Sequence, residues 1–403
     1  MNILSISTMF PSKAEPIFGI FVKRRLDALS RIVNLTVVSP RPYFPFISLT
    51  SRYRVRREIP HREQVNERTP LYLPRFLSFP LILKPLDGVF LFITMFFFIL
   101  RHRRKGLKFD LIDAHLAYPE GFAAIWLGKI FNVPVTITLR GHDVNYLPRY
   151  PVRKKQVLYA LDKADRVFSV CNALRLEAGD LGVDINKIVV ASNGVETDLF
   201  YPVDKKKARQ KVGLDPDLRY ILSIGYLIER KGFDLVIDAL SILREKYNIT
   251  DTKVIIIGGR GGERYVKDEL VEQIQRLNLD GQVIFIDTVR NEELNDYYNC
   301  ADVFCLASSH EGWPNVILEA LACAVPVVGT NVWGIPEIFG DNKDVGLIVE
   351  RDKNNIAEGL RSALTKKWDS AKIKAFAESK TWMKTAELLK HEMNSLISNH
   401  KGK

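Results

Sequence analysis

The 403-residue chain is 47% hydrophobic and 26% charged, and its formal net charge is +11. This length excludes a single ordinary α/β domain and suits two domains that each bury a core. The four cysteines, Cys171, Cys300, Cys305 and Cys323, are scattered without a C-x-x-C pair, which is typical of reduced core thiols.

The positive charge lies in the first half of the chain. Residues 1–200 hold 29 Lys and Arg against 17 Asp and Glu, whereas the remainder carries a net charge of −1. Two basic runs, at 52–57 and 101–105, are compatible with nucleic acid, anionic lipid or water as their surroundings. We expect no nucleic-acid partner and favour a membrane surface, because the second run directly follows an apolar segment.

Short β-branched strands alternate with helix-like stretches from the first residue, a pattern typical of a parallel sheet covered on both faces. Because the start M-N-I-L-S-I-S-T is strand-like and has no basic n-region, we expect no cleaved signal and a cytoplasmic catalytic part. In the first half the predicted strands are 3–7, 35–38, 111–114, 135–139, 167–170 and 188–190, and the predicted helices are about 20–32, 86–104, 120–131, 152–164 and 172–181.

Residues 39–85 depart from this pattern, since they are rich in Pro, Arg and aromatic residues and show no clear period. We interpret them as a long surface excursion on the acceptor side. They lead to an apolar run at 89–100, which R-H-R-R-K follows at once. About 12 apolar residues are too few to span a bilayer, so the run is either a buried crossover helix or a helix at a membrane surface. The adjoining cations favour peripheral contact with an anionic membrane, on its inner face.

The alternation restarts after a loop at 193–202. The predicted strands are then 220–224, 254–257, 283–286, 303–306, 325–328 and 347–349, with helices at 234–247, 264–277, 291–299, 315–323 and 353–364. We therefore predict an α/β protein with two doubly wound Rossmann-like domains, 1–200 and 201–382, facing a central cleft. A final helix lies within 383–403 and packs on either domain, a return to the first being one of the two arrangements.

The stretch S-S-H-E-G-W-P-N-V-I-L-E at 308–319 follows a predicted strand and precedes an apolar helix. Pro314 suits a first helical turn, where a missing N–H leaves no bond unmade. The N–H groups there favour an anion, and a diphosphate fits such a helix N-terminus. Glu311 and Glu319 add two carboxylates at the same mouth, which are good acceptors for sugar hydroxyls, although both are also ordinary acids at a helix start. The candidate donor contacts are Gly312, Trp313, Pro314, Asn315, Val316 and Glu319.

Two other turns follow predicted strands of the second domain. G-Y-L-I-E-R-K-G begins at Gly225, and its Arg230 and Lys231 would offer fixed positive charge to a leaving phosphate at the ligand-binding edge of the sheet. I-I-I-G-G-R-G-G-E contains Gly258 and Gly259, which would let the backbone approach a nucleotide. Many strand-to-helix turns are rich in glycine, so this second signal is weak by itself.

Together these elements resemble the C-terminal domain of the family 4 glycosyltransferases, which are retaining enzymes of the GT-B fold. The resemblance implies that Glu311 and Glu319 form the family's E-x7-E signature, with the first acid at the transferred sugar and the second at the nucleotide ribose. It also implies that the basic pair at Lys231 holds the diphosphate. Many members carry Arg where this chain has Tyr226, and Arg230 would supply that charge. The likeness is greatest to polysaccharide-assembly members of the teichuronic acid type.

The resemblance extends into the first half of the chain. Gly19 in P-I-F-G-I-F-V is similar to the family's first glycine loop, which is implied to lie against the donor phosphates. D-A-H-L-A-Y-P-E-G, with His115, and L-R-G-H-D-V, with Arg140 and His142, also look like family elements. Many members carry His-Gly at the second of these, where this chain has Arg140 before the glycine. Either Arg140 or His142 would therefore touch the sugar.

The sequence thus predicts transfer of a sugar from a nucleotide-diphosphate sugar to a saccharide acceptor, either linked to a polyprenyl lipid or soluble. We expect no metal, since no D-x-D pair ends a strand and no cluster of His, Cys and acids has ligand spacing. Two alternatives are a nucleotide-sugar epimerase of the same architecture and a non-catalytic nucleotide-sugar-binding protein. A nicotinamide oxidoreductase is disfavoured, because no G-x-G-x-x-G follows the first strand.

Overall fold

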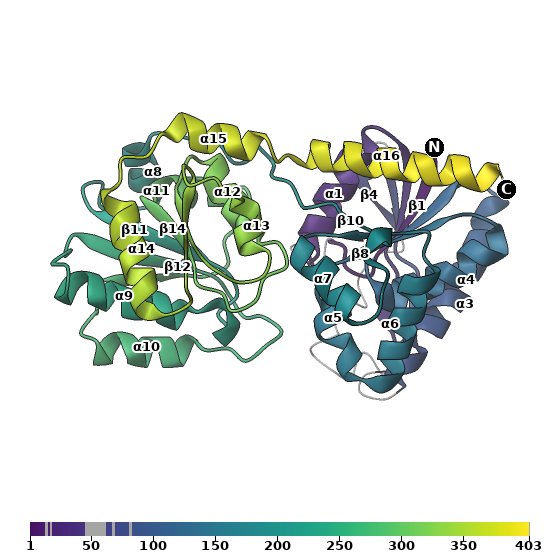
Figure 1. Ribbon diagram of the computed structural model, residues 1–403, viewed down its shortest axis with the longest axis horizontal. Coiled ribbons are helices and arrows are strands. Elements are labelled where there is room, and N and C mark those ends of the chain that lie inside the picture. The colour runs from purple at the N-terminus through teal and green to yellow at the C-terminus, as the bar shows by residue number, and fades with distance from the viewer. Residues whose placement is uncertain (13–14, 17, 45–61, 67–68, 80–82, 403) are drawn as a thin grey trace. The chain divides into compact units, whose positions relative to one another are not determined.

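A computed structural model describes the chain except residues 13–14, 17, 45–61, 67–68, 80–82 and 403. The basic run at 52–57 lies outside the described residues. The chain divides into two compact units, Met1–Asn193 with Trp382–Lys403 and Gly194–Thr381 (Figure 1). The boundary precedes the expected position at 200, because Val195 and Phe200 are buried in the core of the second unit.

The first unit is built on an eight-stranded sheet in the order β10-β9-β8-β7-β1-β2-β5-β4. All neighbouring pairs are parallel except β4 with β5, so the predicted parallel sheet is confirmed. Its strands are β1 (Asn2–Ile6), β2 (Asn34–Val38), β4 (Arg62–Asn66), β5 (Thr69–Tyr72), β7 (Leu111–Ala114), β8 (Val135–Leu139), β9 (Arg166–Ser169) and β10 (Ile188–Val190).

The described part of 39–85 is not an irregular excursion, and that prediction is wrong there. It adds β5 and β4 to the sheet and forms a separate two-stranded sheet from β3 (Arg41–Tyr43) and β6 (Arg75–Leu77). These strands are short, and β4 is polar with only Val65 buried. Edge strands commonly have such compositions, so the sequence lacked the alternation that identifies a strand.

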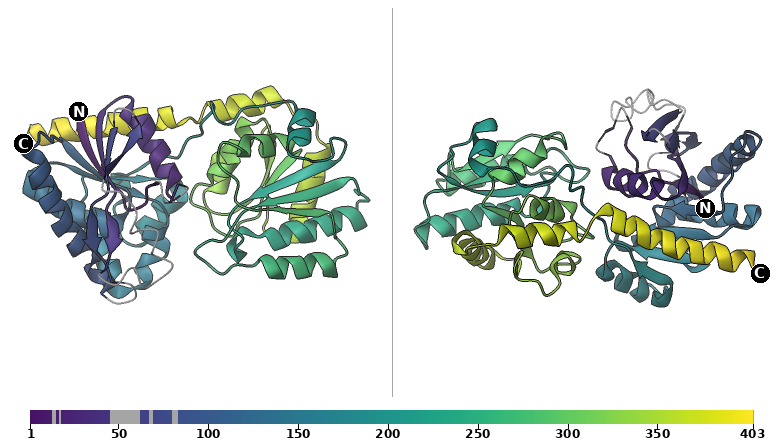
Figure 2. Two further views of the ribbon diagram at one scale, coloured as in Figure 1. Left: turned by 180° about the vertical axis from the view of Figure 1, so that it is seen from behind. Right: turned by 90° about the horizontal axis from the view of Figure 1, so that it is seen from above.

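Helices cover both faces of this sheet (Figure 2). On one face of the sheet, Ile3, Leu35 and Leu111 pack against α1 and α16. Side chains alternate along a strand, so Ile112 and Ile137 lie on the opposite face, which α4 covers. α3 and α6 pack beside α4. The helices are α1 (Ile20–Ser30), α3 (Asp87–Arg103), α4 (Phe122–Phe131), α5 (His142–Asn145), α6 (Pro151–Lys163), α7 (Asn172–Asp180) and α16 (Trp382–Lys401).

The helix that contains the apolar run has the predicted extent, since α3 (Asp87–Arg103) matches the expected 86–104 within one residue at each end. Lys84–Arg103 forms a helical segment of 20 residues that is long and apolar enough to cross a membrane by length and composition alone. Only 22% of its most apolar window is buried, which also argues against a fully buried crossover helix. Its buried residues, among them Leu91, Met95 and Ile99, recur every four positions and form one face that packs on the unit.

The second unit contains a fully parallel six-stranded sheet in the order β13-β12-β11-β14-β15-β16. α9, α10 and α14 bury one face with Ile221 and Val254, and α11, α12, α13 and α15 bury the other with Leu222 and Ile255. The strands are β11 (Arg219–Ile224), β12 (Thr252–Ile257), β13 (Val283–Ile286), β14 (Val303–Leu306), β15 (Val327–Thr330) and β16 (Gly346–Val349). The helices are α8 (Lys205–Lys211), α9 (Phe233–Glu245), α10 (Lys267–Arg276), α11 (Leu294–Cys300), α12 (Asn315–Ala322), α13 (Ile335–Phe339), α14 (Lys353–Thr365) and α15 (Ser370–Glu378).

The last helix, α16, belongs to the first unit. Trp382, Ala386, Leu389 and Met393 are buried at helical spacing in the core that α1 also covers. Thr385 Oγ1 donates a hydrogen bond of 2.8 Å to the Ser192 carbonyl, which ties α16 to the end of the sheet. Of the two arrangements that the sequence allowed, the return to the first domain is the observed one. All four cysteines are buried and free.

Candidate active site

In the second unit, two loops meet because their strands are neighbours. β11 and β14 pair in parallel, so both loops leave the carboxyl edge of the sheet side by side. The loop after β11 contains a short 3-10 helix, η7 (Glu229–Lys231). Arg230 joins the two loops, since its Nη1 donates to the His310 carbonyl at 2.8 Å and its own carbonyl accepts from the Ser309 N–H at 2.9 Å.

Glu311 is the centre of this arrangement. Its Oε1 accepts hydrogen bonds from Lys231 Nζ and from Ser308 Oγ (2.8 Å), and Arg230 Nη1 lies 3.4 Å away. No contact among the described residues uses Oε2 of Glu311. The side chains of Lys231 and Glu311 are 13% and 12% exposed, so the pair is largely shielded but reachable. One oxygen is thus anchored and the other is available to a ligand hydroxyl.

The charge state of Glu311 follows from its neighbours. Burial alone would raise the pKa of its carboxyl, but the positive charges of Lys231 and Arg230 outweigh burial and lower it. Glu311 is therefore an anion at neutral pH. An arriving diphosphate would compete with it for the two cations.

The N-terminus of α12 differs by one position from the expectation. Pro314 was expected in the first turn of the helix. It is instead the N-cap residue, with extended backbone angles, and the helix starts at Asn315. No side chain caps the helix. Trp313 packs partly against the core, and its Nε1 is buried without a hydrogen-bond partner among the described residues. Val316 is also partly buried against this core.

Glu319 lies inside α12 and is buried. It is 5% exposed, and its Oε2 accepts a hydrogen bond of 2.8 Å from the Tyr298 hydroxyl on α11. One oxygen of Glu319 is therefore committed to α11, and contact of this carboxylate with the nucleotide ribose stays a prediction. The helix is buried on all sides from Ile317 to Ala322, so a carboxylate at position 319 requires a polar partner inside the unit, and Tyr298 is one.

The glycines of the second unit have packing reasons of their own. A Cβ on Gly258 would lie 1.8 Å from the Gly225 carbonyl oxygen, and one on Gly259 would lie 2.4 Å from Thr288 Oγ1. The loop after β12 can therefore approach the loops after β11 and β13 only without these side chains. In the first unit, Gly19 is the N-cap residue of α1 and adopts φ 71°. It lies against the backbone of Met9. Approach of a nucleotide to any of these glycines stays a prediction.

In the first unit, His115 is the centre of a buried network. Its Nε2 lies 3.0 Å from both Asp113 Oδ2 and Ser5 Oγ, and Arg140 Nη2 donates to its Nδ1 at 2.8 Å. Because arginine can only donate, Nδ1 must be the unprotonated nitrogen, and Nε2 carries the proton. Burial lowers the pKa of His115 to about 4, which agrees with a neutral ring. Arg140 is further held by Asn193 (3.4 Å).

A second buried carboxylate orders the loop after β8. Asp143 accepts hydrogen bonds from the backbone N–H of Ala117 (2.6 Å) and of Arg140 (2.8 Å). Glu120 accepts two bonds of 2.7 Å from Thr8, one from its N–H and one from its hydroxyl. Burial raises the pKa of Asp143 to about 6 and that of Glu120 to about 7. These acids fix the loops of the first unit and are not themselves exposed.

His142 lies outside the network. It is exposed, stacks on Tyr146 with ring centroids 4.5 Å apart, and lines a cavity of the first unit. Although much of its surface is exposed, partial desolvation of the ring, followed by the charge of Arg153, lowers the pKa of His142. Of the two alternatives for a sugar contact, Arg140 is engaged by protein groups, whereas His142 faces a space that a ligand could fill.

The structure brings together Glu311, Arg230 and Lys231 in one unit and His115 and Arg140 in the other. Sequence reasoning missed Asp113 and Ser308, which hold these groups in place. A signal for Asp113 existed, because it stands two residues before His115 along a strand and therefore on the same face. Ser308 has no comparable signal, since its role depends on how a loop turns.

Two known protein families match the chain, one for each half. Residues 31–199 match Glycosyltransferase Family 4, and residues 204–380 match Glycosyl transferases group 1. The chain is 29% identical over 367 residues to a Bacillus subtilis protein named "Putative teichuronic acid biosynthesis glycosyltransferase TuaC", covering 89% of this chain and 88% of that protein. It is 26% identical over 320 residues to the D-inositol 3-phosphate glycosyltransferase of Pseudarthrobacter chlorophenolicus, covering 75% and 74% of the two chains.

Solved structures share the fold. The sucrose-phosphate synthase of Thermosynechococcus elongatus superposes with a TM-score of 0.76 at 18% identity, covering 99% of this chain and all of that one. Anabaena Alr3699/HepE in complex with UDP superposes with a TM-score of 0.73 at 18% identity, covering 98% of this chain and all of that one. These likenesses confirm the predicted GT-B fold.

Proposed function

Because the chain belongs to the glycosyltransferases that combine a family 4 domain with a group 1 domain, we propose that it transfers a sugar from a nucleotide-diphosphate donor to a saccharide acceptor, with retention of the anomeric configuration. The Anabaena relative of the same fold has been solved with UDP and with UDP-glucose, which supports a nucleotide sugar as donor. The teichuronic acid relative supports a role in cell-surface polysaccharide assembly.

The observation that carries this proposal is the geometry of Glu311. Three donors hold its Oε1, so the carboxylate has one orientation, and Oε2 is left for a hydroxyl of the transferred sugar. Lys231 and Arg230 both contact Oε1 of Glu311. A diphosphate that took over these two cations would therefore bind directly beside the carboxylate that contacts the sugar. Fixed charges of this kind stabilise a leaving group without reorganisation during the reaction.

We propose that these cations and the N-terminus of α12 supply the positive charge that a divalent metal would otherwise provide. The described ranges contain no group of three or more His, Cys, Asp or Glu side chains placed to hold a metal ion. Full activity in the presence of EDTA is the expected result. Loss of activity that Mg²⁺ or Mn²⁺ restores would contradict metal independence.

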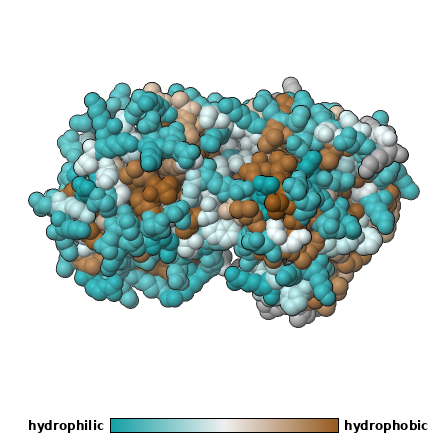
Figure 3. Space-filling model, viewed as in Figure 1, coloured by the Kyte–Doolittle hydropathy of each residue, from teal (hydrophilic) through white to brown (hydrophobic). Residues whose placement is uncertain are grey.

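The acceptor is proposed to be a lipid-linked saccharide, taken up at the inner face of the membrane by the first unit. The outer face of α3 and the turn before it exposes large apolar side chains, with Phe97 at 63%. Figure 3 shows apolar side chains at the edge of this unit where α3 and α4 lie. The exposed apolar residues there are Leu83, Leu86, Val89, Ile93, Phe97 and Leu100, with Trp126 and Ile130 on α4.

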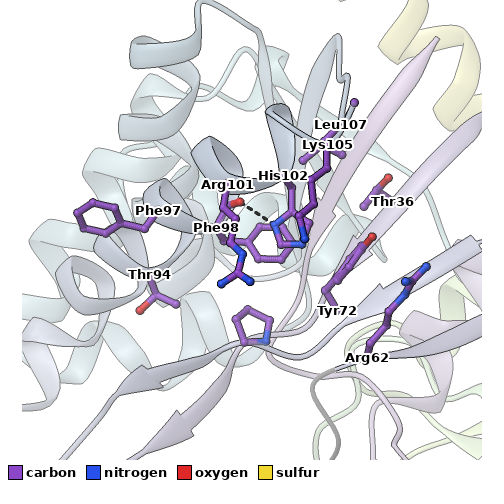
Figure 4. A pocket seen from close by; sticks show the side chains of 12 residues that line it. Thr36, Arg62, Tyr72, Thr94, Phe97, Phe98, Arg101, His102, Lys105 and Leu107 are labelled. Atoms are coloured by element: carbon purple, nitrogen blue, oxygen red, sulfur yellow. Dashed lines mark hydrogen bonds between the residues drawn. The ribbon is translucent and has the colours of Figure 1, made fainter.

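This apolar face ends in a basic groove. The groove has a volume of about 1010 Å³, and Arg62, Arg101 and Lys105 surround the aromatic rings of Tyr72 and Phe98 (Figure 4). None of the three cations forms an ion pair with a described acidic residue. Apolar burial and attraction to anionic headgroups add, so the two features together suit an anionic bilayer surface.

We propose that α3 lies flat on the bilayer instead of crossing it. Leu91, Met95 and Ile99 on its inner face are fully buried in the first unit, and the Gly88 N–H donates to the Tyr118 hydroxyl at 3.0 Å. A helix that left the unit to span a bilayer would lose this packing. A helix that stays in place can still insert its outer face by several ångströms.

Lys231→Ala tests the catalytic part of the proposal. The fold should persist, because Arg230 and Ser308 still hold Glu311, while kcat for sugar transfer should fall about 10²–10³-fold. Lys206→Ala is the matched control, since Lys206 is an exposed lysine of the same unit. A panel of UDP, GDP and ADP sugars in thermal-shift measurements would first identify the donor. Near-normal kcat in Lys231→Ala, or an inverted product in NMR, would overturn the assignment.

Vesicle co-sedimentation tests the membrane part. The full chain should bind vesicles that contain phosphatidylglycerol and not vesicles of phosphatidylcholine alone. Phe97→Asp should weaken this binding about tenfold, because a large apolar side chain that would insert into the bilayer is replaced by a charge. Val271→Asp is the matched control, since Val271 is an exposed apolar residue of α10 in the second unit. Equal binding by both variants would assign the contact to another surface.

A further inference from the structure

A cavity of about 370 Å³ lies in the first unit at the carboxyl ends of β1, β7 and β8. Ligands of doubly wound domains bind at this edge, and the volume is within the range of small-molecule pockets. We name it the Arg153 pocket. The residues that matter for its chemistry are Met9, Lys84, Asp87, Tyr118, His142 and Arg153.

The charges of the Arg153 pocket do not balance. Lys84 Nζ is matched by Asp87 Oδ2 at 3.2 Å and also donates to Ser78 Oγ at 2.8 Å. The lowered pKa of His142 leaves its ring neutral near pH 7. Arg153 forms no ion pair or hydrogen bond with any described residue, and its Nε is buried. Two cations, Lys84 and Arg153, therefore face the single carboxylate of Asp87, and the cavity carries a surplus of positive charge.

Arg153 also packs over an aromatic ring. Its Cζ lies 4.4 Å from the centroid of the Tyr150 ring, and a stacked guanidinium keeps its plane while its edge stays available. The ring of Tyr150 continues a row of aromatic rings through Tyr146 (5.8 Å) to His142 (4.5 Å). A sugar ring that packed on this row would present its substituents to Arg153. A planar, stacked guanidinium is the group that proteins use for bidentate binding of carboxylates and phosphates.

We propose that the Arg153 pocket binds a negatively charged group of the acceptor, a carboxylate or a phosphate attached to a saccharide. Asp87 adds a position for a hydroxyl, because its Oδ1 is buried and has no hydrogen-bond partner among the described residues. The inference rests on the proposed transferase function and specifies its acceptor as an acidic or phosphorylated saccharide.

Three small probes separate the two sources of negative charge. Methyl β-glucuronide and methyl β-glucoside differ only by a carboxylate in place of a hydroxymethyl group, and glucose 1-phosphate supplies a phosphate. In NMR titrations of the full chain at pH 7.5, at least one charged probe should bind about tenfold more tightly than the glucoside. Arg153→Gln should abolish this preference. Arg149→Gln is the matched control, because Arg149 stacks on Tyr146 (5.7 Å) but does not line the pocket.

A preference for the glucuronide alone or for glucose 1-phosphate alone supports the proposal and identifies the group. Equal affinity for all three probes, absence of binding by all of them, or a preference that survives Arg153→Gln overturns it. UDP binding, measured on the same samples, reports on the second unit and should be unchanged in Arg153→Gln. Failure of UDP to bind would count against the transferase function and leaves the readout of the Arg153 pocket intact.

Discussion

The two units both place charged side chains at the carboxyl ends of their strands, but they balance these charges differently. In the first unit Asp113, His115 and Arg140 bond to one another in a buried chain that leaves the histidine neutral. In the second, Lys231 and Arg230 share one oxygen of Glu311, and the other oxygen is open. The first arrangement fixes shape, whereas the second can exchange its partner for a ligand. Substitutions should therefore affect mainly stability in one unit and mainly turnover in the other.

The largest effect on stability is expected from Asp113→Ala. This change removes a buried carboxylate whose charge stabilises the buried cations Arg25 and Arg140, which should cost about 3–5 kcal/mol in the free energy of unfolding. Urea unfolding, with hydrogen exchange of the β7 amides to assign the transition, measures it. Asp162→Ala removes an exposed carboxylate beside Lys163 and should leave the transition in place. A similar loss in both variants would show that the network does not hold the first unit together.

Glu311→Gln should instead separate binding from turnover. The amide cannot carry the charge that balances Lys231 and Arg230, so kcat should fall about 100-fold, while the freed cations should bind UDP at least as tightly as before. Steady-state kinetics and UDP titration give the two numbers. Glu263→Gln, which removes only an exposed partner of Arg230, should change neither. Weaker UDP binding in Glu311→Gln would mean that the cations do not reach the diphosphate.

Glu120→Gln should change how the first unit responds to pH. The pKa of Glu120 is raised by burial to about 7 from an ordinary 4.5, so its contribution to stability is present at low pH and is lost as the pH rises through about 7. Relative to the glutamine variant, the natural protein should lose about 2 kcal/mol of stability between pH 5 and pH 8. The pH dependence that His115 introduces is common to both proteins and cancels. Parallel stability curves would refute the raised pKa.

The smallest effect on stability is expected from His142→Ala. This side chain is exposed and stacks only on Tyr146, so the unfolding midpoint should not move. Binding of the charged saccharide probe should weaken about three- to tenfold, because the row of aromatic rings is shortened. Arg140→Lys should behave in the opposite way, since one ammonium cannot replace the bonds to His115 and Asn193. Matching results for the two variants would remove the distinction between a ligand contact and a positioning residue.

The sequence predicted the regular parts of both sheets because buried parallel strands read as continuous β-branched runs. The strands 111–114, 135–139, 188–190, 283–286 and 303–306 have the predicted bounds. β4 was missed because an edge strand lies half in solvent and needs few apolar residues, and β5 was missed because it has only four residues, one of them a proline. The helix at 86–104 was predicted within one residue at each end, because its long apolar run is bounded by polar and cationic residues.

Some features of the candidate site could be predicted from the sequence and others could not. The neighbours of Glu311 could be predicted, because two adjacent parallel strands bring their following loops together whatever the loop sequences are. The direction of Glu319 depends on the presence of Tyr298 from a helix that precedes it in the chain. A pattern of residue types along one segment does not contain that partner. Arg153 escaped notice for the same reason, since only the folded structure shows a cavity with a surplus of positive charge.

The return of α16 to the first unit has a consequence for the order in which the chain matures during synthesis. The second unit is one continuous stretch and is complete once Thr381 has left the ribosome, whereas the first lacks part of its core until the last helix follows. The unit that is made first is therefore the one that finishes last. Trp382, Leu389 and Met393 of α16 share a core with Leu26 and Leu29 of α1. Until α16 has been synthesised, this apolar surface of the first unit is incomplete and is available to a chaperone.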